Sequence, residues 1–444
     1  MVGVAKFGLR RQVVALEIEG SNPSAHPNPV ILRSKAEDCT LAIETASSSW
    51  NVSTNPHLEG MEVVREGDKS GYGMVIRFIL RGGREVSAIA LPHQFPTRTG
   101  PTWAYLIDCE GLTLVDAGPM GALNALENGL KVLGRNLMDI KRVIITHGHQ
   151  DHDGNVYDLL KASGAELWAH ELYFHFLPYE HARTGLNKES ALHRSIFEVR
   201  KREDESFQSR TVPTDNLLWR DHYRDYIAGH RNILEEKLPI HAISDGEELG
   251  DLQFLYTPGH AVDEICVTMN GVMFTGDHIL PQITPHPTIK RTYPEAMLGL
   301  VISPEHQEAG EHYGLARYLK SLGKTLRLDY HTTLFPAHRL FNHGRLNIRN
   351  LQRGHEIVRH HVRRLEQVME VMSAGADTPV KVTEELFPPR KLTGGGFVAA
   401  VSEVVSHLEL LADTGDIQVS QAGQIRRNGT DIFHSEINGM TARR

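Results

Sequence analysis

Four metal-binding side chains occur within six residues of this chain, immediately after a run typical of a buried strand. The segment T-H-G-H-Q-D-H occupies residues 146–152 and follows the apolar run 143–145. A short apolar run of this kind indicates a strand covered on both faces. His147 and His149 are two residues apart, so in an extended turn their side chains project to the same side. Asp151 and His152 follow where the chain tightens into a helix, so the four groups can serve two adjacent ions.

Three further metal-binding positions occur later, each just after an apolar or β-rich run. They are His260 in T-P-G-H, Asp277 in T-G-D-H and His338 in F-P-A-H. Each one alone is a weak signal, because a single histidine near a strand end is more often structural. Histidine is the commonest metal ligand, and the chain has 26 of them. Taken together and in this order, the seven positions indicate a metal site.

This order of residues resembles the signature of the metallo-β-lactamase superfamily, H-x-H-x-D-H followed by His, Asp and His. The resemblance covers roughly residues 75–350. It implies an α+β fold, an αβ/βα sandwich of two packed mixed sheets with outer helices and a metal site at one edge. It also implies a metal-dependent hydrolase.

The resemblance further implies a role for each site residue. One ion would be bound by His147, His149 and His260, the other by Asp151, His152 and His338, with Asp277 bridging both. Asp116, in V-D-A-G, matches a further motif of the family, and its carboxylate is expected to support the ligand loop. Aspartate rather than cysteine at 277 indicates hydrolases of the glyoxalase II type.

The chemistry implied is hydrolysis by a metal-bound hydroxide. Two ions sharing one water lower its pKa from 15.7 toward about 7, and the ions are expected to be zinc, with iron or manganese as alternatives. Asp151 is the expected catalytic residue, because it can orient the nucleophile and shuttle a proton. The expected substrate is a small acyl compound, a thioester or a lactone. The alternative is a metal-dependent endoribonuclease of the lactamase-like type.

A long insertion at residues 171–239 is predicted to be a helical lid over the metal ions. Helical stretches are expected near residues 190–205 and 223–237. Its ring-bearing residues are candidates for lining a substrate pocket, with packing as the alternative: Tyr173, His175, Tyr179, His181, His193, Tyr223 and Tyr226. His278 is a candidate for contacting substrate or a metal ligand, with a structural hydrogen bond as the alternative.

Residues 354–434 are predicted to form a small C-terminal domain. Three helical stretches followed by a hairpin signal at 417–427 resemble a winged helix. The helix expected at 397–411 has Glu403 and Glu409 but no Lys or Arg, whereas a DNA-reading helix needs basic residues. We therefore expect a structural or pocket-completing module rather than a nucleic-acid binder.

Composition adds further expectations. Residues 1–60 lack a sustained period and are expected to be a disordered extension or a mis-annotated segment, with the true start at Met61 or Met74. The net charge of −8 disfavours nucleic acid as a partner. No apolar run reaches the about 18 residues that a membrane helix needs, and the three cysteines suit a reducing cytoplasm. A homo-oligomer is left open.

Overall fold

The structure is a computed structural model that describes the chain from residue 55 to 442 with several gaps. The described residues are 55–94, 97, 99–176, 190–208, 213–285, 289–290 and 314–442, without the side chains of 204–223. Residues 1–54 lie outside the described residues, and so does the question whether they form a disordered extension or a mis-annotated segment.

The first sheet has eight strands that lie in sequence order. They are β1 (Leu58–Arg65), β2 (Val75–Leu80), β3 (Glu85–Leu91), β4 (Thr102–Asp108), β5 (Leu112–Val115), β6 (Ile140–Ile144), β7 (Glu166–His170) and β8 (Ile240–Ile243). Neighbours from β1 to β5 are antiparallel, and neighbours from β5 to β8 are parallel. Parallel neighbours need crossover connections. Here they include α1 (Leu123–Val132), a short 3₁₀ turn (Leu137–Asp139), α2 (Gln150–Asp153) and α3 (Val156–Ser163).

The second sheet has six strands in the order β16-β13-β12-β11-β10-β9. They are β9 (Glu248–Leu249), β10 (Leu252–Tyr256), β11 (Ile265–Met269), β12 (Val272–Gly276), β13 (Thr333–Pro336) and β16 (Arg349–Asn350). Only β12 and β13 are parallel neighbours in this sheet, and α9 (Leu315–Thr325) lies between them in the chain. A small hairpin, β14 (Phe341–Asn342) with β15 (Arg345–Leu346), follows β13.

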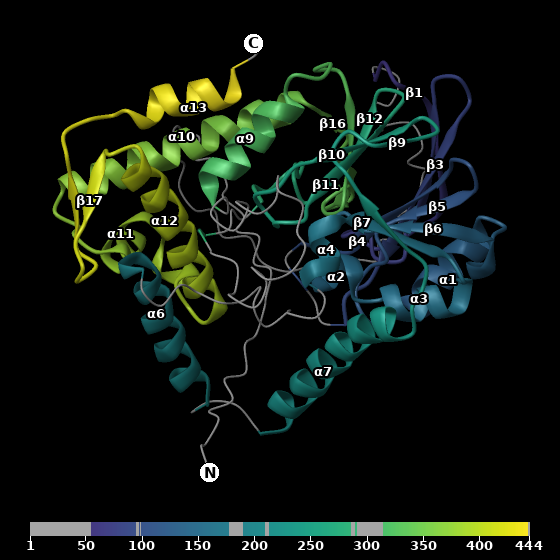
Figure 1. Cartoon of the computed structure of the whole chain (residues 1–444), viewed down its shortest axis with the longest axis horizontal. Coiled ribbons are helices and arrows are strands. Elements are labelled where there is room, and N and C mark those ends of the chain that lie inside the picture. The colour runs from purple at the N-terminus through teal and green to yellow at the C-terminus, as the bar shows by residue number, and fades with distance from the viewer. Residues whose placement is uncertain are drawn as a thin grey trace, which may run out of the picture.

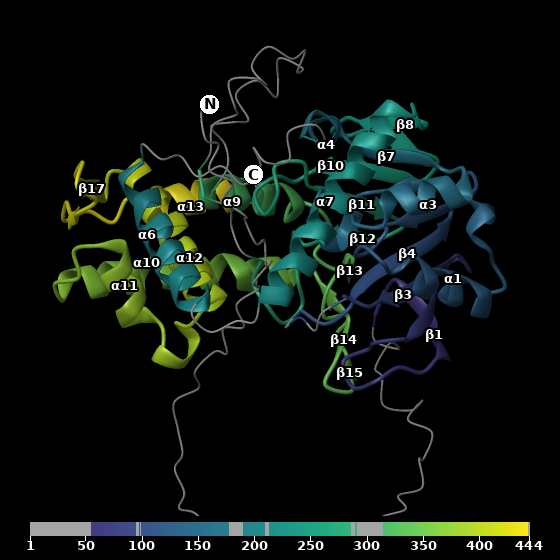
Figure 2. The same cartoon turned by 90° about the horizontal axis from the view of Figure 1, so that it is seen from below.

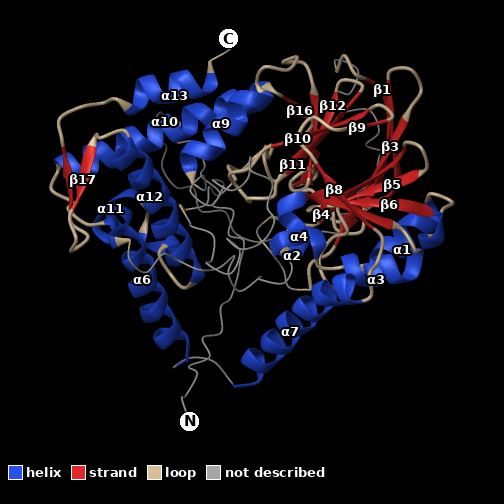
Figure 3. Ribbon diagram, viewed as in Figure 1, coloured by secondary structure: helices blue, strands red, loops and turns tan. Residues whose placement is uncertain are grey.

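The two sheets pack face to face and helices cover their outer faces. One apolar core contains side chains of both sheets, among them Phe78, Tyr105 and Phe335. A second core joins the outer face of the first sheet to α1 and α3, and a third joins the second sheet to α9 and the C-terminal helices. The layers are therefore helix, sheet, sheet and helix, which confirms the predicted αβ/βα sandwich (Figures 1 and 3).

The insertion separates into helices that pack on different parts of the molecule. It contains α4 (Glu171–Phe176), α6 (Ala191–Gln208) and α7 (Pro213–Glu235). Helix α7 packs against α3, whereas α6 packs against α12 (Gly395–Asp413) of the C-terminal part. Figures 1 and 2 both show α6 lying along α12, while α7 lies with the sandwich.

The C-terminal part contains the predicted three helices and hairpin, plus one more helix. It comprises α10 (Gln352–Ser373), α11 (Pro379–Leu386), a 3₁₀ turn (Pro389–Lys391), α12, β17 (Ile417–Val419), β18 (Ile425–Arg427) and α13 (Phe433–Thr441). By length and hydropathy α12 is the one helix among the described residues that could cross a membrane, yet 67% of that window is buried inside the structure. Its apolar character is that of a core helix, because α6, α10 and α11 all pack on it.

Two segments differ from the sequence-based expectation. Strand β1 begins at Leu58, within the stretch expected to be an extension, and the Leu58 side chain is buried in the core between the sheets. Helix α13 has no counterpart in the sequence prediction. It packs on α9, and its Phe433 and Ile437 complete the core there.

Candidate metal centre

The seven predicted ligands lie at one edge of the sandwich, because each follows the C-terminal end of a strand. The segment 146–152 follows β6, and His260, Asp277 and His338 follow β10, β12 and β13. Thr146 joins the two sheets at this point: its carbonyl accepts a hydrogen bond from the Ile265 amide of β11 at 2.9 Å.

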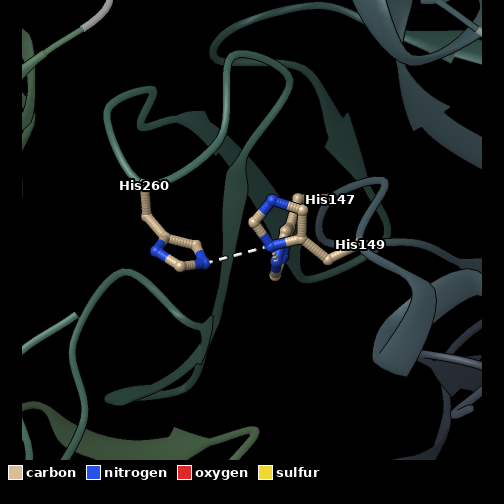
Figure 4. A group of neighbouring side chains, drawn as sticks. All are labelled: His147, His149 and His260. Carbon is tan, nitrogen blue, oxygen red and sulfur yellow. Dashed lines mark hydrogen bonds between the residues drawn. The ribbon is translucent and has the colours of Figure 1, made fainter. Parts of the chain in front are cut away.

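Three imidazoles form the first cluster. His147 Nε2 lies 2.8 Å from His149 Nδ1, and His260 Nε2 lies 3.1 Å from the same Nδ1 atom. Figure 4 shows the His260 ring, carried by a separate loop, facing the rings of His147 and His149. These two rings belong to the turn formed by residues 146–152, here called the ligand turn. One donor atom from each residue lies within 4.8 Å of the others, which is a separation that a single cation can span.

A second cluster combines carboxylates and imidazoles. His338 Nε2 lies 3.1 Å from Asp151 Oδ2, and His152 Nε2 lies 3.9 Å from Asp151 Oδ1. The His152 and His338 side chains are fully buried, whereas 12% of the Asp151 side chain is exposed. Asp151 is thus the member of this cluster that solvent can reach.

Asp277 lies between the two clusters. Its Oδ2 is 3.5 Å from His260 Nε2, while its Oδ1 is 3.5 Å from His338 Nε2 and 3.7 Å from His152 Nε2. One carboxylate therefore presents one oxygen to each cluster, as the resemblance implied for a bridging residue.

The two clusters, together with Asp277 between them, fit a pair of divalent cations. His152 Nε2 and Asp277 Oδ1 are buried and have no hydrogen-bond partner among the described residues. Buried polar atoms are normally hydrogen-bonded, so two buried atoms that lack a hydrogen bond at one site need an explanation. Imidazole and carboxylate donors that converge on one point are the donors that zinc, iron and manganese accept.

Asp116 holds the ligand turn in place through contacts with Thr146 and His152. It sits directly after β5 with a φ of 63°. Its Oδ1 accepts hydrogen bonds from the Thr146 amide and hydroxyl, both at 2.9 Å, and its Oδ2 lies 2.9 Å from His152 Nδ1. The contact on Nδ1 turns the other nitrogen of His152 toward Asp277.

The electrostatics of the centre hold His147 and Asp151 in the protonation states that bind metal, whereas the neighbouring carboxylates outweigh burial and raise the pKa of His152 and of His338. Burial, together with the neighbouring imidazoles of His152, His149 and His260, holds the pKa of His147 well below its usual value. Burial raises the pKa of Asp151, but the imidazoles of His152 and His338 outweigh it and hold that pKa well below its usual value. His147 is therefore neutral and Asp151 anionic near neutral pH.

Sequence reasoning did not find three residues of the centre. His93, just after β3, offers a ring nitrogen within 4.8 Å of the donor atoms of Asp151 and His338. Asp263 Oδ2 accepts a hydrogen bond from the Gly148 amide at 2.9 Å. Glu264 is fully buried, accepts a hydrogen bond from the Asp277 amide at 3.1 Å, and has a pKa raised well above its usual value by burial and by Asp277.

A signal for His93 exists in the sequence. It follows a β-rich run, as the other strand-end ligands do, but it lies outside the motifs. Burial lowers its pKa to about 4, with the Asp151 carboxylate opposing the shift. For the acidic pair 263–264, the only signal is its closeness to His260 in the chain.

The structure does not bring the predicted substrate contacts into the clusters. His278 lies 3.4 Å from Thr325 Oγ1 and is fully buried against α9. Tyr173 belongs to the core on the outer face of the first sheet, and His175 Nε2 lies 3.5 Å from a carboxylate oxygen of Glu171. Two further predicted positions, Tyr179 and His181, lie outside the described residues, as does the Tyr223 side chain.

Comparison with known proteins identifies the class. The family model described as "Metallo-beta-lactamase superfamily" matches residues 97–338, more than half of the chain. The chain belongs to the metallo-beta-lactamase superfamily, as its motifs predicted.

Individual relatives support the same family. A curated protein of Bacillus subtilis (strain 168), "Probable metallo-hydrolase YqjP", is 40% identical over 72 residues. The aligned part covers 16% of this chain and 22% of that protein, so the match spans about a fifth of the relative's length.

Two solved structures share the fold. The metallo-beta-lactamase family protein TTHA1429 of Thermus thermophilus is 21% identical, with a TM-score of 0.50, 77% of this chain covered and 98% of that chain. A beta-lactamase domain protein of Burkholderia ambifaria is 20% identical, with a TM-score of 0.53, 77% of this chain covered and 92% of that chain. At this identity the likeness concerns the fold.

Proposed function

We propose that this protein is a hydrolase of small acyl substrates, thioesters or lactones, that works with two divalent cations, zinc by preference. The placement of Asp277, with one oxygen toward each cluster, carries the proposal. A single-ion site would need no carboxylate that faces two ways. The family assignment and the name of the Bacillus relative support hydrolysis.

The residues of the chain divide into those that hold the cations and one that is placed to handle a proton. One cation would be held by His147, His149 and His260, the other by Asp151, His152 and His338, and Asp277 would contribute to both. When bound, such a pair lowers the pKa of a shared water toward about 7 and polarises the scissile carbonyl. Asp151 is anionic and partly open to solvent, so its carboxylate can orient water or pass a proton to the leaving group.

The packing of α6 on α12 favours a small substrate over RNA. In a winged helix, the second helix of the helix-turn-helix pair enters the groove of a nucleic acid. Here that helix is α12, and α6 packs along it. Its three carboxylates are occupied as well: Glu403 pairs with Arg364 at 3.1 Å, Glu409 with His193 at 2.6 Å, and Asp413 with Lys290. The alternative, a lactamase-like ribonuclease, would need a different RNA-binding surface.

A substrate panel tests the proposal. The full-length protein, loaded with zinc, is assayed against an acyl-coenzyme A, S-lactoylglutathione, a lactone, a β-lactam and single-stranded RNA. We expect turnover of a thioester or a lactone, abolished in His147→Ala. Cleavage of RNA alone would replace this proposal by the ribonuclease, and failure of the protein to bind two equivalents of metal would refute the two-cation site.

A further inference from the structure

We propose that His93 is an additional metal ligand, which binds the cation held by Asp151 and His338. The inference rests on the proposed two-cation function and deepens it. Neither the sequence motifs nor the family comparison assigns a role to His93.

The first argument is distance. Ring-nitrogen and carboxylate donors of His93, Asp151 and His338 lie within 4.8 Å of one another. The donor atoms of His147, His149 and His260 in the first cluster lie within the same limit. The rings of His93 and His338 also lie nearly parallel, with centroids 6.1 Å apart and an interplanar angle of 29°.

The second argument is that consecutive residues at the start of β4 hold both imidazoles. The Pro101 carbonyl lies 3.3 Å from His338 Nδ1, and the Thr102 hydroxyl lies 3.3 Å from His93 Nε2. Metal-binding histidines characteristically make such a hydrogen bond on the nitrogen that does not face the metal, as His338 does with Nδ1 on Pro101 and Nε2 toward Asp151. The Trp103 amide then donates to the Ala337 carbonyl at 2.8 Å, which fixes this strand start against the loop that carries His338.

The third argument is the balance of donors between the two cations. Without His93, the first cluster supplies three imidazoles and the second only two, those of His152 and His338. With His93, the second cluster also has three imidazoles, beside the Asp151 carboxylate. The second site then holds its cation more tightly than the motif residues alone would.

Metal titration of His93→Ala tests the assignment. The metal-free protein is titrated with Co²⁺ and Zn²⁺, and the two dissociation constants are obtained from cobalt absorption and from competition with a chelator. We expect the dissociation constant of the cation at Asp151 and His338 to rise at least about tenfold, while the other dissociation constant is unchanged. His241→Ala is the matched control, since that ring also stacks on a neighbour, Trp168 at 3.8 Å, but belongs to neither cluster.

A count of coordinated imidazoles makes the test independent of how the alanine variant folds. In the dicobalt form of the wild-type protein, each bound histidine gives a paramagnetically shifted N–H proton resonance. We expect one more resonance than the five histidines of the sequence motifs supply, and its loss in His93→Asn. Two cations bound with only five such resonances, and unchanged affinities in His93→Ala, would overturn the role of His93 and leave the two-cation site intact. A wild-type protein that binds no second cation would instead refute the proposed function.

Discussion

His152 presents Nδ1 to Asp116 Oδ2 at 2.9 Å, and the same carboxylate accepts the Thr146 amide hydrogen bond. One side chain directly after β5 therefore fixes both the backbone and an imidazole of the ligand turn. Such outer carboxylates orient histidine ligands and raise their basicity. Burial lowers the pKa of His152, but Asp116, Asp151 and Asp277 together raise it well above its usual value.

Replacing Asp116 with asparagine should weaken metal binding without unfolding the protein. The asparagine amide would donate toward His152 Nδ1, so the imidazole proton would move to Nε2, the atom that faces Asp277. We expect the affinity for the cation at His152 to fall about 10–100-fold. Chelator competition measures it, with Asp108→Asn, at an exposed strand end, as the control. Wild-type affinity in Asp116→Asn would contradict this role.

Removing Asp151 should abolish hydrolysis and leave the fold intact. The loss of its carboxylate removes a donor from the second cation and the group placed to move a proton. We expect Asp151→Ala to retain the circular dichroism of the wild type, to bind less metal and to show no turnover. Residual activity equal to that of wild type would exclude the predicted catalytic role.

His230 should contribute to stability by covering a buried charge next to the ligand turn. Asp153 is fully buried; its Oδ1 accepts the Tyr226 hydroxyl at 2.8 Å, and its Oδ2 lies 3.1 Å from His230 Nε2. The two atoms lie at ion-pair distance without a hydrogen bond, so His230→Ala removes this contact and a buried ring, and we expect the free energy of unfolding to fall by about 0.5–3 kcal/mol. Urea unfolding measures it. An unchanged free energy of unfolding would show that α7 is not tied to the turn through this pair.

Asp416 should make the C-terminal domain sensitive to acid. Burial raises its pKa, but hydrogen bonds from the Thr430 and Thr414 hydroxyls and from the Ile432 and Phe433 amides outweigh burial and lower it. A lowered folded-state pKa means that the carboxylate stabilises the fold above the unfolded pKa of about 3.9, and that this stability is lost as pH falls through the folded value.

The matching variant is Asp416→Asn. At pH 7 we expect it to be less stable than wild type by about 0.5–2 kcal/mol, the value of an acidic group at a helix start, here that of α13. The difference should shrink as the pH falls below about 4, where the unfolded chain takes up the proton, and it should vanish below the folded-state pKa, where the wild-type carboxyl is itself protonated. Urea unfolding at both pH values measures it, and a difference that grew on acidification would contradict the assignment.

The convergence of the seven candidate ligands at one edge could be predicted because each follows an apolar or β-rich run that marks a strand, and because their order resembles the family signature. The supporting roles of Asp263 and Glu264 could not, because they depend on a loop from one sheet reaching the turn of the other. The helices of the insertion were expected, but the elements on which they pack, α12 for α6 and α3 for α7, were not. An amphipathic pattern shows that a face is buried and does not say against what, so the packing of α6 on α12 was not foreseen.

The packing of α6 on α12 has a consequence for how this protein can vary. The His193–Glu409 contact joins residues 216 positions apart, and Leu192, Ile196 and Val199 share one core with Val401 and Leu408. A larger side chain at any of these positions would need a compensating change in the other helix. The insertion and the C-terminal segment should therefore be inherited as a matched pair, and exchanging either one alone between homologues should yield insoluble chimaeras.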